Sequence, residues 1–140
     1  ARPLGTTAEL SEVVIDAIPA ASKKFPGHPA RRTFQAIRIA VNKEIEILES
    51  ALKQTIRRLT KEGRCVIISY HSGEDRIVKK TLRAAAGLST TVPKHLPQPE
   101  EQPMIRLLAR GGKTPLQSEI SQNPRSKSAR LRSFEKMREN

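Results

Sequence analysis

The sequence predicts an α/β fold, with helices packed against a sheet. Three observations support this prediction. Residues 30–59 carry apolar side chains at steps of three or four, which is typical of a helix. Residues 64–69 form a short, β-branched apolar run, which is typical of a buried strand. A turn and another helical pattern follow directly, and this order of elements indicates an α/β sheet.

The first predicted element is a helix over residues 6–18. Thr6 and Glu9 have the spacing of a capping box, in which each side chain satisfies a backbone amide near the other. Pro19 ends the helix, because the residue before a proline leaves the α region. We expect a loop over residues 20–29.

The apolar stripe from Phe34 to Leu59 predicts the second helical segment. A single straight helix over residues 30–59 would be about 45 Å long. We therefore expect a kink near Asn42 or Lys43. Gly63 marks the turn into the next strand.

Residues 64–69 predict a central parallel strand that is buried on both faces. Ser72 and Asp75 then have capping spacing, and the helix that they begin is expected to stop at Gly87. Residues 88–103 are rich in proline and threonine, so we expect a mobile connection there.

The C-terminal part predicts three short elements. Residues 104–109 resemble a strand and residues 116–122 a short helix. Residues 128–136 alternate between basic and less polar side chains, which favours a final, antiparallel edge strand. A doubly covered strand needs neighbours on both sides, and an unpaired edge exposes amides and carbonyls. The chain therefore predicts the second part of an α/β domain whose first strands lie elsewhere.

Composition indicates an anionic partner. The 140 residues carry a formal net charge of +12, and nucleic acid is the commonest partner of such a chain. Only three Phe, one Tyr and no Trp argue against a single-strand binder that stacks bases on aromatic rings. No apolar run approaches the ~20 residues of a membrane span and no leader pattern opens the chain. We therefore expect a cytoplasmic protein without a membrane partner.

Standard enzyme motifs are missing from the sequence. It contains neither a dinucleotide-binding nor a P-loop glycine pattern. The single cysteine and the three histidines are too far apart for a standard metal site, so no metal is expected. The candidate functional residues must be sought among basic and polar side chains.

One candidate RNA-binding group lies on the long helix. Arg31, Gln35, Arg38 and Asn42 step by four, three and four, which places them on one face. Arginine offers a planar donor fork to phosphate, and the two amides both donate and accept hydrogen bonds. A solvated helix face explains the same pattern.

His71 is the candidate catalytic residue. It follows the strand over residues 64–69, and ligands of open α/β sheets lie outside the carboxyl ends of strands. Histidine is in general the side chain that exchanges protons near neutral pH, so this residue type is suited to contact a substrate or move a proton. A structural role is an equally good interpretation.

The C-terminal stretch is the second candidate RNA-binding group. Residues 104–140 contain nine Lys or Arg and three acids, so they carry half of the excess charge. Phosphate binding by such a cluster depends on salt and ignores sequence. A contribution to solubility alone also explains this excess of charge. The densest part of the basic stretch contains Arg125, Lys127, Arg130 and Arg132.

Three stretches in order resemble the RsmH (MraW) methyltransferase family. The first runs His-Pro-Ala-Arg-Arg-Thr-Phe-Gln-Ala-Ile-Arg over residues 28–38 and continues to Asn42 and Glu44. The second is Ser-Tyr-His-Ser-Gly-Glu-Asp-Arg-Ile-Val-Lys over residues 69–79. The third is Asn-Pro-Arg-Ser-Lys-Ser-Ala-Arg-Leu-Arg over residues 123–132. The resemblance covers essentially the whole chain.

The resemblance implies a methyltransferase that uses S-adenosylmethionine to methylate the exocyclic N4 of a cytosine in 16S rRNA, at the decoding centre of the small ribosomal subunit. It implies a Rossmann-like domain interrupted by an inserted helical domain that helps to hold the RNA. Residues 1–42 would belong to the insertion and residues 43–140 would complete the methyltransferase sheet.

The chain departs from this family in two ways. Family members are roughly twice as long, and the cofactor loop and catalytic acidic motif of their first halves are not in this sequence. Gly73 also replaces a usual leucine, which costs up to ~1 kcal/mol of helix stability. We therefore expect no cofactor-binding residue in this chain and no catalysis by it alone. Two alternatives are also consistent with the sequence. One is a basic RNA-binding or scaffolding fragment that catalyses no reaction, and the other is a module in which helices pair with a partner. A second copy of the chain is a further candidate partner, which would make a homodimer.

Overall fold

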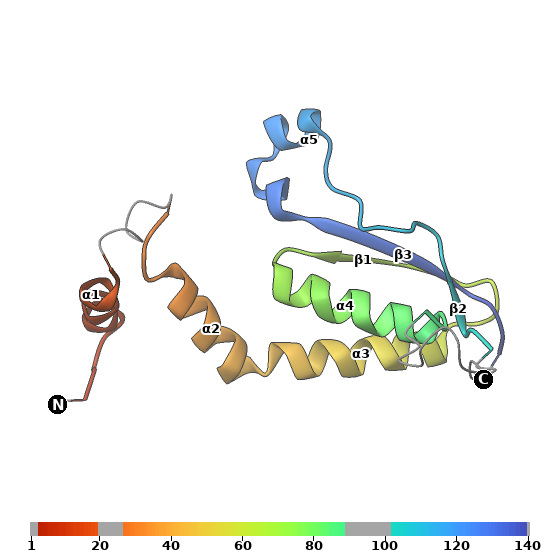
Figure 1. The fold of residues 1–140 in the computed structure, drawn as a ribbon, viewed down its shortest axis with the longest axis horizontal. Coiled ribbons are helices and arrows are strands. Elements are labelled where there is room, and N and C mark those ends of the chain that lie inside the picture. Colours follow the sequence, from red (N-terminus) through yellow and green to blue (C-terminus); the bar gives the residue numbers. More distant parts are fainter. Residues whose placement is uncertain (1–2, 20–26, 89–101, 140) are drawn as a thin grey trace, which may run out of the picture. The chain divides into compact units, whose positions relative to one another are not determined.

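The computed structural model describes residues 3–19, 27–88 and 102–139. They form an α/β arrangement of helices and one antiparallel sheet (Figure 1). Internal contacts divide the chain into two compact units, residues 1–44 and residues 45–140. In the described part of the chain, no helix combines the length and apolar character that a membrane span requires. The prediction for residues 88–103 lies almost wholly outside the described residues, as does most of that for residues 20–29.

The described residues of the first unit contain helices α1 (Thr7–Ala17) and α2 (Arg31–Asn42). Helix α1 begins as predicted, because Thr6 and Glu9 close a capping box. Helix α2 ends at Lys43, whose backbone is left-handed at φ 50°. Helix α3 (Glu44–Arg58) starts immediately afterwards. The predicted kink near Asn42 or Lys43 is confirmed as a break between two helices.

The second unit contains a sheet of three strands. They are β1 (Arg64–Ser69), β2 (Ile105–Leu107) and β3 (Arg130–Lys136). Their order is β1-β3-β2, and both neighbours run antiparallel to β3. Strands β1 and β2 are therefore parallel to each other, and β3 lies between them.

Two predictions about strand position are wrong. Among the described residues β1 pairs with β3 alone, so it is an antiparallel edge strand rather than a central parallel one. It is also open on one face, because Val66 and Ile68 are 60% and 54% exposed. The predicted C-terminal edge strand is instead central, with Phe134 opposite both Cys65 and Leu107. Alternation reports which face of a strand is buried, whereas its place in the sheet depends on distant partners.

The core lies between the sheet and helices α3 and α4 (Ser72–Ala85), which cover the same face of the sheet (Figure 1). Burial of apolar surface on this face stabilises the unit. Helix α4 stops two residues before Gly87, which adopts φ +66° as its predicted C-terminal role requires. The core side chains are Leu52, Ile56, Val78, Leu82, Ile105 and Phe134.

Two short helices lead into β3. Helix α5 (Gln117–Gln122) is close to the predicted short helix over residues 116–122. The 3₁₀ helix η2 (Pro124–Ser128) follows, with Asn123 as its N-cap. Pro124 suits this position, since its fixed φ is helical and its missing N–H would have no helical partner.

Candidate functional site

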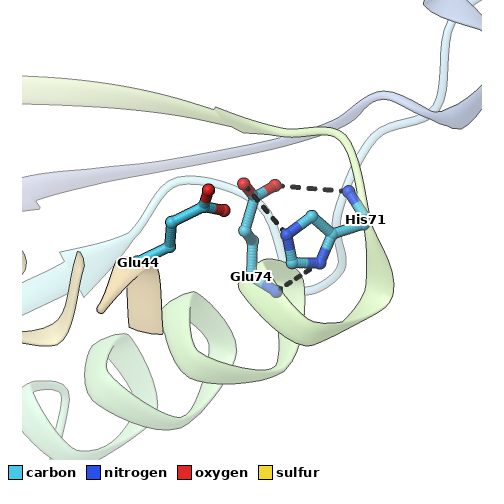
Figure 2. A group of neighbouring side chains, drawn as sticks. All are labelled: Glu44, His71 and Glu74. Carbon is cyan, nitrogen blue, oxygen red and sulfur yellow. Dashed lines mark hydrogen bonds and ion pairs between the residues drawn. The ribbon is translucent and has the colours of Figure 1, made fainter. Parts of the chain in front are cut away.

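The turn between β1 and α4 is closed by His71 and Glu74 (Figure 2). The backbone N–H of Glu74 donates a hydrogen bond to Nδ1 of His71 at 3.2 Å. In return, Oε2 of Glu74 accepts from the backbone N–H groups of Tyr70 and His71, at 2.9 and 3.2 Å. These contacts satisfy amides that the start of a helix leaves without partners. The expected cap by Ser72 and Asp75 is therefore wrong by one residue.

The cap determines which nitrogen of His71 carries a proton. Because Nδ1 accepts a hydrogen bond, the neutral ring holds its proton on Nε2. Nε2 is buried, lies 3.2 Å from Oε1 of Glu74 and has no hydrogen bond of good geometry within the described residues. The ring thus has a clear structural task at the helix start. Its predicted catalytic role stays a prediction.

Arg132 is fixed by a bidentate ion pair with Asp75. Nε and Nη2 of Arg132 donate to the two carboxylate oxygens of Asp75 at 2.7 and 2.9 Å. The hydrogen bond from Arg132 lowers the pKa of the Asp75 carboxyl, and partial desolvation opposes this effect. The pair connects α4 to β3, two elements that are distant in the sequence. Arg132 therefore has a structural partner in addition to any RNA contact.

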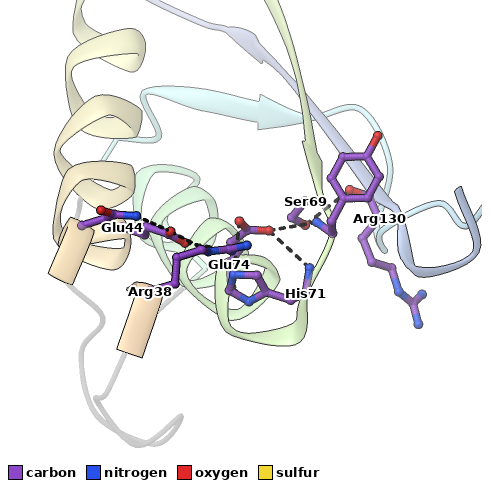
Figure 3. Close-up of polar contacts among 8 residues, drawn as sticks. Arg38, Glu44, Ser69, His71, Glu74 and Arg130 are labelled. Carbon is purple, nitrogen blue, oxygen red and sulfur yellow. Dashed lines mark hydrogen bonds and ion pairs between the residues drawn. The ribbon is translucent and has the colours of Figure 1, made fainter. Parts of the chain in front are cut away.

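Arg130 lies at the same end of the sheet as His71. It is opposite Ser69 in the ladder, and the hydroxyl of Ser69 donates to the carbonyl of Arg130 at 3.4 Å. Figure 3 shows the Arg130 side chain extending away from this contact. The neighbouring η2 exposes Arg125 and Lys127. The structure thus brings the predicted C-terminal basic cluster close to the carboxyl end of β1.

The predicted group on α2 also has an acidic partner. Arg38 donates to both carboxylate oxygens of Glu44 at 2.8 and 3.1 Å (Figure 3). Asn42 donates to Oε1 of Glu44 at 3.2 Å. Arg31 is exposed and Gln35 is half-buried. The carboxylate stabilises the C-terminal end of this face and offsets part of its positive charge.

Glu135 is a residue that the sequence patterns did not single out. On the face of the sheet away from the core, it accepts from Arg64 at 2.8 Å and from Arg106 at 2.7 Å. The hydrogen bond from Arg64 is the main cause of a lowered Glu135 pKa, with a further contribution from Arg106. No local spacing reveals this trio, because its members come from three different strands.

Burial distinguishes Cys65 from a reactive thiol. Its side chain packs against the core, and desolvation raises the pKa of the thiol. A raised pKa reduces the fraction of thiolate, which is the nucleophilic form. Cys65 thus acts as a small core residue, as its position in an apolar strand predicts.

Comparison with known proteins supplies the family. The model of the MraW methylase family matches residues 1–137. The chain is 49% identical over 137 residues to ribosomal RNA small subunit methyltransferase H of Thermobifida fusca, covering 98% of this chain and 42% of that protein. The protein of that name in Acidothermus cellulolyticus is 49% identical over 138 residues, and the one in Beutenbergia cavernae 47% over 140. These alignments cover 99% of this chain and 42% and 41% of the relatives. The chain spans about two fifths of the length of these relatives, and it belongs to the MraW methylase family.

Proposed function

We propose that this chain forms the C-terminal part of an S-adenosylmethionine-dependent rRNA methyltransferase. The observation that carries the proposal is the similarity across 98% of the chain to a relative named ribosomal RNA small subunit methyltransferase H. The proposed product is N4-methylated cytosine at the decoding centre of 16S rRNA, which would place the protein in the cytoplasm. Residues 1–42 would belong to a helical domain for the RNA and residues 43–140 to the methyltransferase domain.

The open side of the sheet supports the assignment to a larger domain. Strand β1 has one edge without a partner among the described residues, and Val66 and Ile68 are exposed beside it. Unpaired edges and apolar faces are normally covered. Further strands and helices from the remainder of the methyltransferase would cover both.

We propose that S-adenosylmethionine binds outside this chain. This cofactor supplies an electrophilic methyl group, and the sequence contains no dinucleotide-binding or P-loop glycine pattern. At the turn after β1, the amides of Tyr70 and His71 are already bonded to Glu74. We therefore assign cofactor binding to parts of the relatives that this chain does not span, and expect the chain alone to be inactive.

The proposed roles of the basic residues concern RNA positioning. Arg125 and Arg130 are exposed and would contact phosphates near the end of β1, since phosphate contacts set register and orientation. Arg132 would position its neighbours, because Asp75 holds its guanidinium. The group on α2, namely Arg31, Gln35, Arg38 and Asn42, would contact RNA from the helical unit.

His71 has two proposed tasks that differ in their chemistry. As a proton acceptor for the cytosine amine, Nδ1 would have to release the Glu74 amide. As a helix cap, it would only position the turn. The variant His71→Asn retains a good capping side chain but not the imidazole. Retained methyl transfer in this variant would support the capping role, and its loss with an unchanged melting temperature would support the catalytic one.

A chimera tests the proposed function. The corresponding C-terminal part of the Thermobifida fusca relative would be replaced by this chain, and small ribosomal subunits would be incubated with it and isotopically labelled S-adenosylmethionine. We expect labelled N4-methylcytidine in the digested 16S rRNA. A folded chimera that transfers no methyl group would contradict the proposal, and micromolar S-adenosylmethionine binding by the isolated chain would contradict its cofactor assignment.

A basic RNA-binding fragment without catalysis is the second candidate. The exposed Arg125, Lys127 and Arg130 favour it, because such a cluster binds phosphate without any chemistry. It predicts salt-dependent RNA binding by the isolated chain together with an inactive chimera.

A further inference from the structure

A basic groove lies between α4, β2 and the segment that follows β2. Its volume is about 680 Å³, and its floor includes the partly exposed Leu88, Leu107 and Met137. This size is within the range of ligand pockets, about 300–1,000 Å³. No carboxylate side chain lines it among the described residues. Its cationic lining consists of Lys79, Arg83, Arg106, Arg110 and Arg132.

Three of the five cations have partners that hold them in place. Asp75 binds Arg132 from outside the lining, whereas the Arg106 guanidinium binds Glu135 on the face of the sheet away from the core. Nη2 of Arg83 donates to the carbonyl of Leu88 at 2.9 Å. These contacts fix the guanidinium groups while leaving other N–H donors unused.

The remaining two cations have no hydrogen-bonded partner among the described residues, although the charge of Lys79 also acts on the Asp75 carboxylate. Lys79 and Arg110 are exposed, and neither side chain makes a hydrogen bond or ion pair to another described residue. Gly112 lies close beside the groove, where a Cβ would be 3.4 Å from the Arg132 guanidinium. The chain thus packs tightly against one fixed cation and presents two free ones next to it.

We propose that this basic groove binds the ribose–phosphate backbone of single-stranded RNA. It would be a contact surface separate from His71, Arg125 and Arg130 at the end of β1. A groove lined by basic residues, with Lys79 and Arg110 free of hydrogen-bonded carboxylates in the described part of the chain, matches a strand that carries one charge per nucleotide. The apolar floor would accommodate ribose faces between successive phosphates. The proposal rests on the proposed function in that RNA is the anionic partner.

The double variant Lys79→Gln/Arg110→Gln tests the proposal. Binding of a fluorescein-labelled single-stranded RNA to the whole chain would be measured by anisotropy at several salt concentrations. Each lost phosphate contact on a single strand reduces the salt slope by about 0.7, so two contacts reduce it by about 1.4 and weaken binding about 25-fold near 0.1 M salt. A slope within about 0.3 of the original would overturn the proposal.

The control is Arg58→Gln/Lys61→Gln, which removes the same charge at two exposed positions outside the groove. General attraction is screened beyond about 10 Å near 0.1 M salt, so we expect a loss of less than about threefold. Equal losses in both double variants would overturn the proposal. Circular dichroism melts of both variants would identify any loss that arises from unfolding.

A competitor distinguishes RNA from an acidic protein. Polyglutamate should displace the labelled RNA far less well than unlabelled RNA of equal charge, and equal displacement would contradict the assignment to RNA. The chimera separates this proposal from the proposed function. If the Lys79→Gln/Arg110→Gln variant weakens RNA binding selectively but the chimera transfers no methyl group, the groove proposal stands and the proposed activity is refuted. If the chimera is active but the double variant binds RNA as before, the proposed activity stands and the groove proposal is refuted.

Discussion

Replacing Asp75 by Asn should loosen the attachment of α4 to the sheet. Asp75 and Arg132 form a two-pronged ion pair, and their side chains are only 21% and 16% exposed. The variant keeps the size of the side chain and removes its charge. Arg132 would then be left mostly buried without an anionic partner.

The expected cost lies between two limits. Removing one partner of a fully buried ion pair costs about 3–5 kcal/mol, whereas an exposed pair contributes about 0–1 kcal/mol. Because roughly a fifth of each side chain remains in solvent, we expect Asp75→Asn to lower the free energy of unfolding by about 2 kcal/mol. About 0.5 kcal/mol of this loss comes from the interaction of the Asp75 carboxylate with the dipole at the start of α4. For a unit of about 100 residues, the melting temperature would fall by about 10 °C.

A double-mutant cycle isolates the ion pair from the helix effect. Urea unfolding followed by circular dichroism would compare the original chain, Asp75→Asn, Arg132→Gln and the double variant. We expect a coupling energy of about 1.5 kcal/mol, since the helix effect of Asp75 is present in both backgrounds. A coupling below about 0.5 kcal/mol would refute the reasoning and indicate that the pair is screened like a surface contact.

Three further predictions follow from the structure. The pKa of the Asp75 carboxyl is lower in the folded chain than its unfolded value of about 3.9. The ionised carboxyl therefore stabilises the fold above the unfolded pKa, and this stabilisation is lost as the pH falls through the native pKa. The Asp75→Asn variant should accordingly show a smaller drop in melting temperature between about pH 5 and pH 2. Ile56→Ala should cost about 2–5 kcal/mol and Ile68→Ala less than about 1 kcal/mol, since these side chains are 4% and 54% exposed; equal losses in urea titrations would contradict the assignment of the open face. Thr6→Ala should cost about 1 kcal/mol and reduce helical ellipticity, because it removes the cap of α1; Thr6→Ser should restore the signal, and an unchanged spectrum in Thr6→Ala would show that the cap contributes little.

Local elements could be predicted from the sequence because their causes lie within a few residues of one another. The capping box at Thr6 and Glu9 involves neighbours three apart and is confirmed. The turn at Gly87 and the break at Lys43 also depend on nearby backbone preferences. The His71 cap shows the limit of such local patterns. His-x-x-Glu and Ser-x-x-Asp overlap with equal spacing, and histidine is not a usual capping residue.

The candidate site was only partly accessible from the sequence. Position after a strand singled out His71 as a candidate, and net charge singled out the basic C-terminal cluster. The partners of these residues were not accessible, because Asp75 and Arg132 are 57 positions apart and meet only when α4 packs on β3. The basic groove is likewise assembled from a helix, two strands and a loop, so no single stretch contains its pattern.

By itself, the sequence determined the α/β class, most of the helix boundaries, the positive charge and the resemblance to a methyltransferase family. These properties depend on side-chain type and on short-range spacing. Only the tertiary structure decided that β3 lies between β1 and β2 and that β1 pairs on one side alone among the described residues. Strand order depends on pairing between segments that are about 65 residues apart, such as the pairing of Cys65 with Phe134. The alternation of side chains within one strand does not indicate which strand it pairs with.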